Sequence, residues 1–306
     1  MNTKINLAGV ELKNPVMTAS GTFGSGMEYS EFVDLNKLGA VVTKGVANVP
    51  WPGNPTPRIA ETYGGMINAI GLQNPGIDVF CERDIPFLKK YDTKIIVNVC
   101  GKSERDYVEV VERLAGEPVD MLEINISCPN VKEGGIAFGQ NAANIEHITK
   151  AIKNVAKQPV IMKLSPNVTD ITEMAKAAEA GGADVLSLIN TITGMKIDIN
   201  RQTFAVANKT GGLSGPAVKP VAVRMVYQVA NAVKIPIIGM GGIATAEDAL
   251  EFILAGATAV SIGTANFHNP RTTLEVIEGI EKYMVNKGVS DINRNSKIKK
   301  TAVGMI

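Results

Sequence analysis

The chain has 306 residues, which suits one large domain or two of ordinary size. Its 31 basic and 30 acidic residues give a formal net charge of +1, so neither nucleic acid nor an anionic membrane is favoured as a partner. The 3 cysteines include no CxxC pair, which argues against a disulfide framework or a metal site and favours a reducing cytoplasm. The sequence shows neither a secretory signal pattern nor a run of apolar residues long enough to span a membrane.

Short runs rich in β-branched residues recur along the chain, and each is followed by polar residues or glycine and then by a helical pattern. Most of these runs are apolar on both faces, which is typical of parallel strands covered by helices. We expect strands near residues 16–19, 40–43, 94–99, 121–126, 160–164, 185–189, 237–240 and 259–262.

Amphipathic segments lie between these strands. Ser103 and Thr245 each stand three residues before an aspartate, a capping-box pattern that marks the start of a helix. Gly256 follows a helical pattern and is expected to end it. Helices are therefore expected over residues 107–115, 144–156, 170–180, 219–232 and 249–255.

Strands that alternate with helices predict an α/β fold, and a count of eight favours a (β/α)₈ TIM barrel over an open doubly wound sheet. No linker divides the chain, so residues 1–306 are expected to form a single domain. The connections 45–76 and 192–219 are unusually long, and both follow strand ends on the expected catalytic face. The shorter loop 128–141, which contains Gly134 and Gly135, is a candidate lid.

Polar side chains follow most of the expected strands. They are Ser20, Lys44, Asn98, Asn125 with Cys128, Lys163, and Asn190 with Thr191. A single Asn after a strand is usually a turn residue, but a set in register predicts one shared site at the mouth of the barrel. Cys128 stands among these polar residues, and a thiol with a pKa near the reference value of about 8.5 can act as a base at mildly alkaline pH.

Glycines follow the last two strands, as Gly241-Gly242 and Gly263-Thr264. Barrels often bind phosphate with these two loops, because backbone N–H groups can approach an anion there. Gly239, Gly241 and Ala244 also match a relaxed dinucleotide fingerprint, but the following strand supplies no acidic residue for a ribose, so a phosphate site is favoured. His147 and His268 lack metal-ligand spacing and are expected to be structural or solvated.

Several motifs in order resemble the class 1 dihydroorotate dehydrogenases. They are NAIGLQNPG at 68–76, NISCPN at 125–130, KLSPN at 163–167, GGLSGP at 211–216, GGI at 241–243 and GT at 263–264. The similarity covers nearly the whole chain. It departs from the family pattern at Gly45, where Ser or Thr is expected, and over residues 46–51.

The resemblance implies a flavoenzyme that binds FMN and oxidises dihydroorotate to orotate, with Cys128 taking the proton from C5 while the hydride passes from C6 to the flavin. It implies FMN contacts at Ser20, Lys44, Gly45, Asn98, Asn125, Lys163, Ile189, Gly215, Gly241, Gly242, Gly263 and Thr264. It implies substrate contacts at Lys44, Asn68, Ala69, Ile70, Gly71, Leu72, Asn125, Asn190 and Thr191. Another flavin-dependent barrel reductase, for dihydropyrimidines or enoates, is an alternative, as is a non-catalytic phosphate-binding barrel.

The segments VKEGG at 131–135 and GNPTPR at 53–58 resemble the type B subgroup of this family. Type B members are implied to be catalytic subunits that work with an electron-transfer subunit carrying FAD and an iron–sulfur cluster, which reduces NAD⁺. The implied assembly is a heterotetramer of two catalytic and two electron-transfer chains. Type A homodimers, which use fumarate, are the alternative. Membrane-bound class 2 enzymes differ because they use serine as the base and carry an N-terminal extension.

Overall fold

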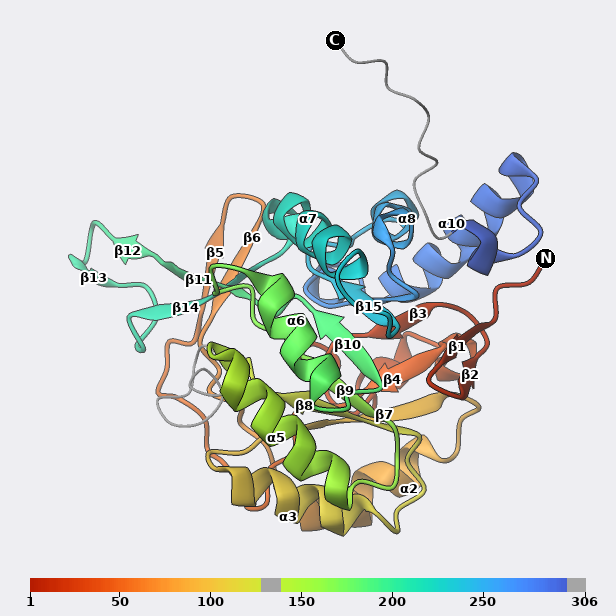
Figure 1. The fold of residues 1–306 in the computed structure, drawn as a ribbon. Helices are drawn as coiled ribbons and strands as arrows, with labels where there is room; N and C mark the ends of the chain where they lie inside the picture. The colour runs from red at the N-terminus through yellow and green to blue at the C-terminus, as the bar shows by residue number, and fades with distance from the viewer. Residues whose placement is uncertain (128–138, 296–306) are drawn as a thin grey trace.

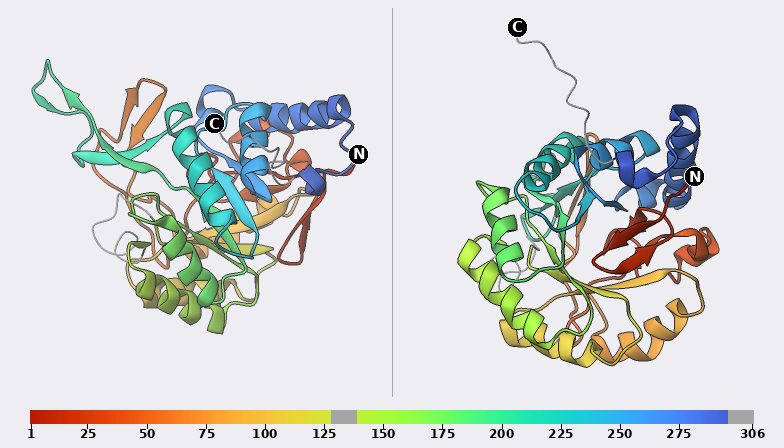
Figure 2. Two further views of the ribbon diagram at one scale, coloured as in Figure 1. Left: turned by 45° about the horizontal axis from the view of Figure 1, so that its top comes forward. Right: turned by 45° about the vertical axis from the view of Figure 1, so that its right-hand side comes forward.

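The structure is a computed structural model that describes residues 1–127 and 139–295. Parallel strands close into a barrel that is ringed by helices (Figures 1 and 2). The barrel strands are β3 Val16–Thr18, β4 Ala40–Val42, β7 Lys94–Val99, β8 Met121–Asn125, β9 Val160–Lys163, β10 Val185–Leu188, β15 Ile237–Met240 and β16 Ala259–Ile262. Each pairs with the next along the chain, and β16 pairs with β3 to close the ring. The predicted (β/α)₈ barrel is therefore confirmed, and the open doubly wound sheet is wrong.

Several helices between the strands begin where the sequence offers capping side chains. Ser103 and Thr245 form the expected capping boxes with Asp106 and Asp248. Gly256 ends its helix in the left-handed region, at φ 115°. The main helices are α3 Glu104–Leu114, α5 Ala142–Val155, α6 Ile171–Ala180, α7 Lys219–Ala230, α8 Ala246–Ala255 and α10 Thr272–Lys287. Shorter ones are α1 Ile77–Val79, a π-helix Phe80–Asp84, α2 Ile85–Leu88 and α9 Ala265–His268.

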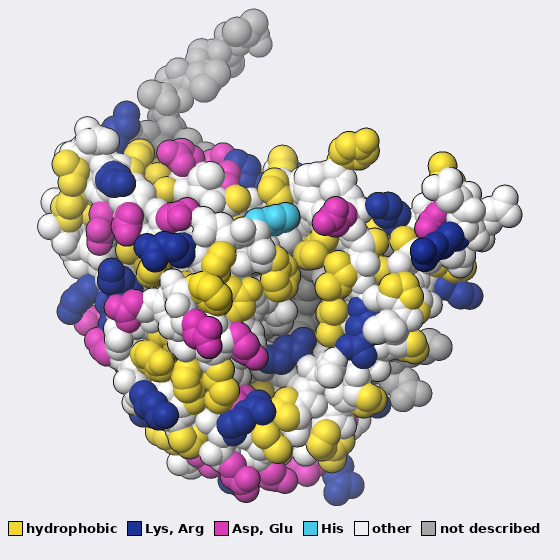
Figure 3. All heavy atoms as spheres, turned by 180° about the vertical axis from the view of Figure 1, so that it is seen from behind, with side chains coloured by type: hydrophobic (Ala, Val, Ile, Leu, Met, Phe, Trp, Pro, Cys, Tyr) yellow, Lys and Arg dark blue, Asp and Glu magenta, His cyan; other side chains and the backbone are white. Residues whose placement is uncertain are grey.

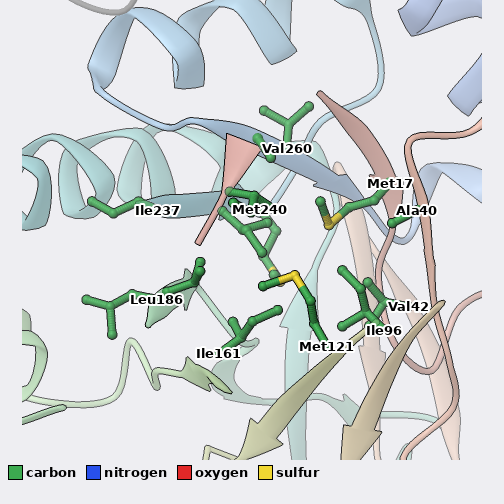
Figure 4. Close-up of a cluster of buried hydrophobic side chains, with 14 of the residues drawn as sticks. Met17, Ala40, Val42, Ile96, Met121, Ile161, Leu186, Ile237, Met240 and Val260 are labelled. Atoms are coloured by element: carbon green, nitrogen blue, oxygen red, sulfur yellow. The ribbon is translucent and has the colours of Figure 1, made fainter. Parts of the chain in front are cut away.

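Apolar side chains from every strand of the barrel form one buried cluster (Figure 4). Met17 comes from β3, Met121 from β8 and Val260 from β16, and none of the three is exposed to solvent. The N-terminal hairpin of β1 Ile5–Leu7 and β2 Val10–Leu12 joins the same cluster through Leu7 and Leu12. Close packing of this kind fixes the barrel as a rigid support for the residues at its strand ends.

The two long connections pair with each other. They contribute β5 Ile59–Thr62, β6 Gly65–Asn68, β11 Ile192–Met195 and β14 Thr210–Ser214 to one antiparallel sheet in the order β11, β14, β6, β5. Asn68 Nδ2 donates to Gly212 O, 3.3 Å away, and so joins positions 144 residues apart in sequence. The hairpin of β12 Ile197–Asp198 and β13 Thr203–Phe204 projects from this sheet away from the barrel (Figures 1 and 2).

Candidate active site

A cavity of about 490 Å³ lies between the C-terminal ends of the barrel strands and the sheet made by the long connections. Ile59, Met66 and Leu213 of that sheet form part of its wall. Figure 3 shows the molecule hollowed on one face, with hydrophobic and basic side chains around the hollow. The volume falls within the range of small-molecule and cofactor sites, roughly 300–1,000 Å³.

Most of the residues expected at the site line this cavity. They are Ser20, Lys44, Gly45, Asn68, Ile70, Gly71, Leu72, Asn98, Asn125, Lys163, Ile189, Asn190, Thr191, Gly215, Gly241, Gly242, Gly263 and Thr264. Many of them directly follow a barrel strand or end one, and parallel strands bring such positions to one face. Cys128, the expected base, and most of the candidate lid lie outside the described residues.

Ala69 is the exception among the described positions, because it does not line the cavity. It is 1% exposed and packs with Ile67 and Val206 in a separate small cluster. Its backbone N–H donates to Arg58 O at 2.7 Å, and its carbonyl accepts from Asn54. The segment 68–72 therefore faces the cavity through its other members.

A buried polar network forms the floor of the cavity. Lys163, at the end of β9, is 4% exposed and donates from Nζ to Ser20 Oγ at 3.1 Å. Asn98, in β7, is fully buried and donates from Nδ2 to Glu123 Oε2 at 2.6 Å. The Lys163 ammonium also lies 3.5 Å from that carboxylate oxygen. A cation and amide groups are thus held in fixed positions on the floor.

The network continues through Asn125 to Ser127. Asn125 Nδ2 lies 3.4 Å from Asn98 Oδ1, and Asn125 Oδ1 accepts from Ser127 Oγ at 3.2 Å. Asn190 Nδ2 donates to the same serine hydroxyl at 2.8 Å. Ser127 immediately precedes Cys128 in sequence, and it is thus bonded to two residues of the cavity lining.

Glycines form a cradle at the opposite side of the cavity. Gly215, Gly241 and Gly242 have φ values of 101°, 123° and 82°, which L-residues rarely adopt. A Cβ on Gly242 would lie 2.8 Å from Lys219 Cβ and 2.9 Å from Gly215 O. The backbone therefore approaches the cavity with no side chain between, and α8 begins shortly after Gly242. Such an arrangement suits an anionic group.

Comparisons with known proteins agree with this geometry. The family model described as dihydroorotate dehydrogenase matches residues 2–284. The chain belongs to the dihydroorotate dehydrogenase family. It is 76% identical over 293 residues to the protein named dihydroorotate dehydrogenase B (NAD(+)), catalytic subunit, of Lachnoclostridium phytofermentans, covering 96% of this chain and 98% of that one. It is 67% identical to the protein of the same name from Alkaliphilus oremlandii, covering 95% and 97%.

A solved structure shows the same fold. The crystal structure of DHODH from Eimeria tenella in complex with ferulenol superposes with a TM-score of 0.82 at 24% identity, covering 98% of this chain and 89% of that one. In the described part of this family member, no helix is long and apolar enough to cross a membrane. Nor do the described His, Cys, Asp and Glu side chains form a group of three or more that could hold a metal ion.

Gly45, where the resemblance led us to expect Ser or Thr, lies in a crowded position. A Cβ at this position would lie 3.0 Å from Asn98 Oδ1 and 3.4 Å from Cys100 Sγ. The following residue, Val46, donates its N–H to Asn98 O at 2.8 Å and accepts from Cys100 N at 2.9 Å. Residues 45 and 46 therefore lie tightly against β7 and its end, where a larger residue 45 would press on Asn98.

Sequence reasoning missed two features of this site. His268, expected to be structural or solvated, lines the cavity next to Phe267, and only its position after the last strand could have indicated this. Glu123 lies within β8 in an apolar run and is 1% exposed. A charged residue inside an apolar strand pattern was the available signal, because buried carboxylates are rare unless they are paired.

Proposed function

We propose that this chain is the catalytic subunit of a type B dihydroorotate dehydrogenase, which oxidises (S)-dihydroorotate to orotate in de novo pyrimidine biosynthesis with FMN as cofactor. The observation that carries the proposal is the cavity, whose lining combines two lysines, several asparagines and the glycine cradle. Membership of the family and the names of its close relatives support the same activity. The alternatives of a dihydropyrimidine or enoate reductase are distinguished by a substrate screen.

The residues present fit FMN. The phosphate would lie against the backbone of Gly241, Gly242, Gly263 and Thr264, with Gly215 nearby, because these positions line the cavity and the glycines among them leave the backbone open to it. Lys163 and Asn98 would hold the polar edge of the isoalloxazine, since both are fixed by hydrogen bonds at the cavity floor. When bound, FMN supplies the hydride acceptor for the oxidation.

Substrate recognition is proposed to rest on Lys44 and on the asparagines. Asn68, Asn125 and Asn190 line the cavity, and each amide offers both a donor and an acceptor, as an imide requires. Lys44 also lines the cavity and would balance the substrate carboxylate. Thr191 lies beside Asn190, whose Oδ1 accepts from the Thr191 N–H at 2.7 Å and so keeps the amide oriented.

Cys128 is proposed to remove the proton from C5 of the substrate. Its neighbour Ser127 is fully buried and bonded to Asn125 and Asn190, both of the proposed substrate shell. The remaining cysteines of the described chain, Cys81 and Cys100, are unsuited to the role. Burial raises the pKa of Cys81 to about 11, with nearby Glu117 adding to the shift, and Cys100 does not line the cavity.

Gly242→Ala is expected to weaken FMN binding at least tenfold. The new Cβ would stand within 3 Å of Lys219 Cβ and Gly215 O in a backbone conformation that disfavours L-residues. Gly9→Ala is the matched control, because Gly9 has a φ of 91° but a Cβ added there would meet no atom within 4 Å. FMN fluorescence titration of the apoprotein measures both. Equal affinity in Gly242→Ala and wild type would remove this glycine from the phosphate site.

Electron transfer is proposed to require a partner subunit that carries FAD and an iron–sulfur cluster, in a heterotetramer of two catalytic and two electron-transfer chains. The relatives' name, catalytic subunit, supports a partner, and the described residues offer no cysteine cluster for iron and sulfur.

Cys81 and Cys100 are thiols rather than disulfide partners, which suits a reducing cytoplasm.

The isolated chain is expected to reduce artificial dyes with dihydroorotate but to reduce NAD⁺ poorly. Adding the electron-transfer subunit should restore NADH formation, which is followed by absorbance at steady state. Efficient fumarate turnover by the isolated chain would instead identify a type A enzyme. Rapid NADH formation by the chain alone would contradict the two-subunit proposal.

A further inference from the structure

Glu123 is a buried carboxylate beside the cavity that the oxidation described above does not use. It is 1% exposed and is not part of the cavity lining. Its Oε1 accepts from Ser187 Oγ at 2.8 Å. Its Oε2 accepts from Asn98 Nδ2 at 2.6 Å and lies 3.5 Å from Lys163 Nζ. Both carboxylate oxygens are thus engaged by groups from three other barrel strands.

The strand register places this carboxylate one layer below Asn125 and Lys163 and level with Asn98. Glu123 and Asn125 point to the same side of β8, because side chains alternate along a strand. Asn125 pairs with Lys163 across β8 and β9, and Glu123 pairs with Asn98 across β7 and β8. Glu123 therefore lies below Asn125 and Lys163 and beside Asn98, and it contacts the cavity lining through Asn98 and Lys163.

The charge of Glu123 matters because its partner Lys163 is 4% exposed, so the ammonium acts on a ligand with little screening by water. A carboxylate 3.5 Å from the ammonium makes the pair nearly neutral when seen from the cavity. A neutral ion pair therefore stabilises the anionic reduced form of a ligand less than an isolated lysine would.

We propose that Glu123 is a positioning residue that holds Lys163 and Asn98 against the flavin and offsets the lysine charge, which keeps the flavin reduction potential below the value that Lys163 alone would give. This inference rests on the proposed binding of FMN. The wild-type chain is therefore assayed first for bound FMN. If it binds none, the proposed function fails and Glu123 is not at issue.

The test is the reduction potential of bound flavin in Glu123→Gln, measured by equilibration with a reference dye. Glutamine keeps the shape and removes the charge. The reduced form should gain at least tenfold over the oxidised form, which is about 30 mV for a two-electron couple. A potential that is unchanged or lower would overturn the proposal.

A second variant keeps Lys163 in place and keeps a carboxylate beside it. Glu123→Asp retains the negative charge, so the equilibrium between reduced and oxidised flavin should stay within tenfold of the wild-type value. A rise of tenfold or more in Glu123→Asp, equal to that in Glu123→Gln, would show that the charge of Glu123 does not set the potential and would overturn the proposal.

Asp84→Asn is the matched control for loss of a buried carboxylate. Asp84 is 3% exposed and is bonded to Ser25 and Arg83, with no place in the cavity lining. Its loss should lower thermal stability and leave the flavin potential unchanged. An equal rise of the potential in Asp84→Asn would show that the change in Glu123→Gln is not specific to the site and would overturn the proposal.

Discussion

Cys128→Ala is expected to slow the reduction of bound flavin by dihydroorotate by about 10²–10⁴-fold, the usual cost of losing a general base. The thiol is assigned neither a phosphate contact nor a ring contact, so FMN and orotate should still bind. Cys128→Ser should retain some rate at higher pH, because a hydroxyl is a much weaker acid than a thiol. Stopped-flow absorbance of the anaerobic protein measures the rate directly.

Cys100→Ala is the matched control for this variant. Cys100 is a buried thiol that packs with Ala47 and Trp51 outside the cavity lining, so its loss should affect stability more than rate. Flavin reduction at the wild-type rate in Cys128→Ala would show that another group takes the proton.

Lys44→Ala is expected to weaken orotate binding by about 10- to 100-fold. A charge-assisted hydrogen bond is worth roughly 1.5–3 kcal/mol, and about 1.4 kcal/mol corresponds to tenfold in affinity. Lys44 lines the cavity, where its ammonium can meet the carboxylate of orotate. The change in flavin absorbance on titration with orotate gives the dissociation constant.

Lys37→Ala serves as the control for loss of a lysine. Lys37 is exposed and ends the short helix Leu35–Lys37 that precedes β4, so it lies toward the opposite end of the barrel from the cavity. Its removal should leave orotate affinity unchanged. Unaltered affinity in Lys44→Ala as well would exclude Lys44 from the substrate site.

The barrel could be predicted from sequence because its strands are short apolar runs with helical patterns between them. The predicted strand 94–99 matches β7, and 237–240 matches β15, residue for residue. Helix ends were predicted less closely: α5 begins at Ala142 rather than at residue 144, because Asn141 caps it by accepting from Asn144 N. Local side-chain capping of this kind leaves a weaker signal than hydrophobic periodicity.

The sheet over the cavity could not be predicted, because its pairing is not local. β6 and β14 contain glycines and lack a strong alternating pattern, and each is stabilised by the other from a distant part of the chain. Ala69 illustrates the consequence for the site. It was expected to contact substrate with its neighbours, but the backbone carries its side chain into the cluster with Ile67 and Val206.

The site residues were found because parallel strands bring their C-terminal ends together, which makes position along the strand informative. Asn98 and Lys163 could be assigned to the same floor for this reason. Their partner Glu123 lies within β8 rather than at its end, where sequence position gives no indication of which cation a carboxylate will meet. Side-chain pairing of this kind across neighbouring strands becomes visible in the folded barrel alone.

The most direct test of the proposed function is the anaerobic addition of dihydroorotate to the purified chain while flavin absorbance is recorded. We expect a chain that carries FMN and loses its oxidised-flavin absorbance on addition of dihydroorotate, with orotate formed in equal amount. A colourless chain, or bound flavin that stays oxidised with excess dihydroorotate and is reduced by a different dihydropyrimidine or an enoate donor, would contradict it.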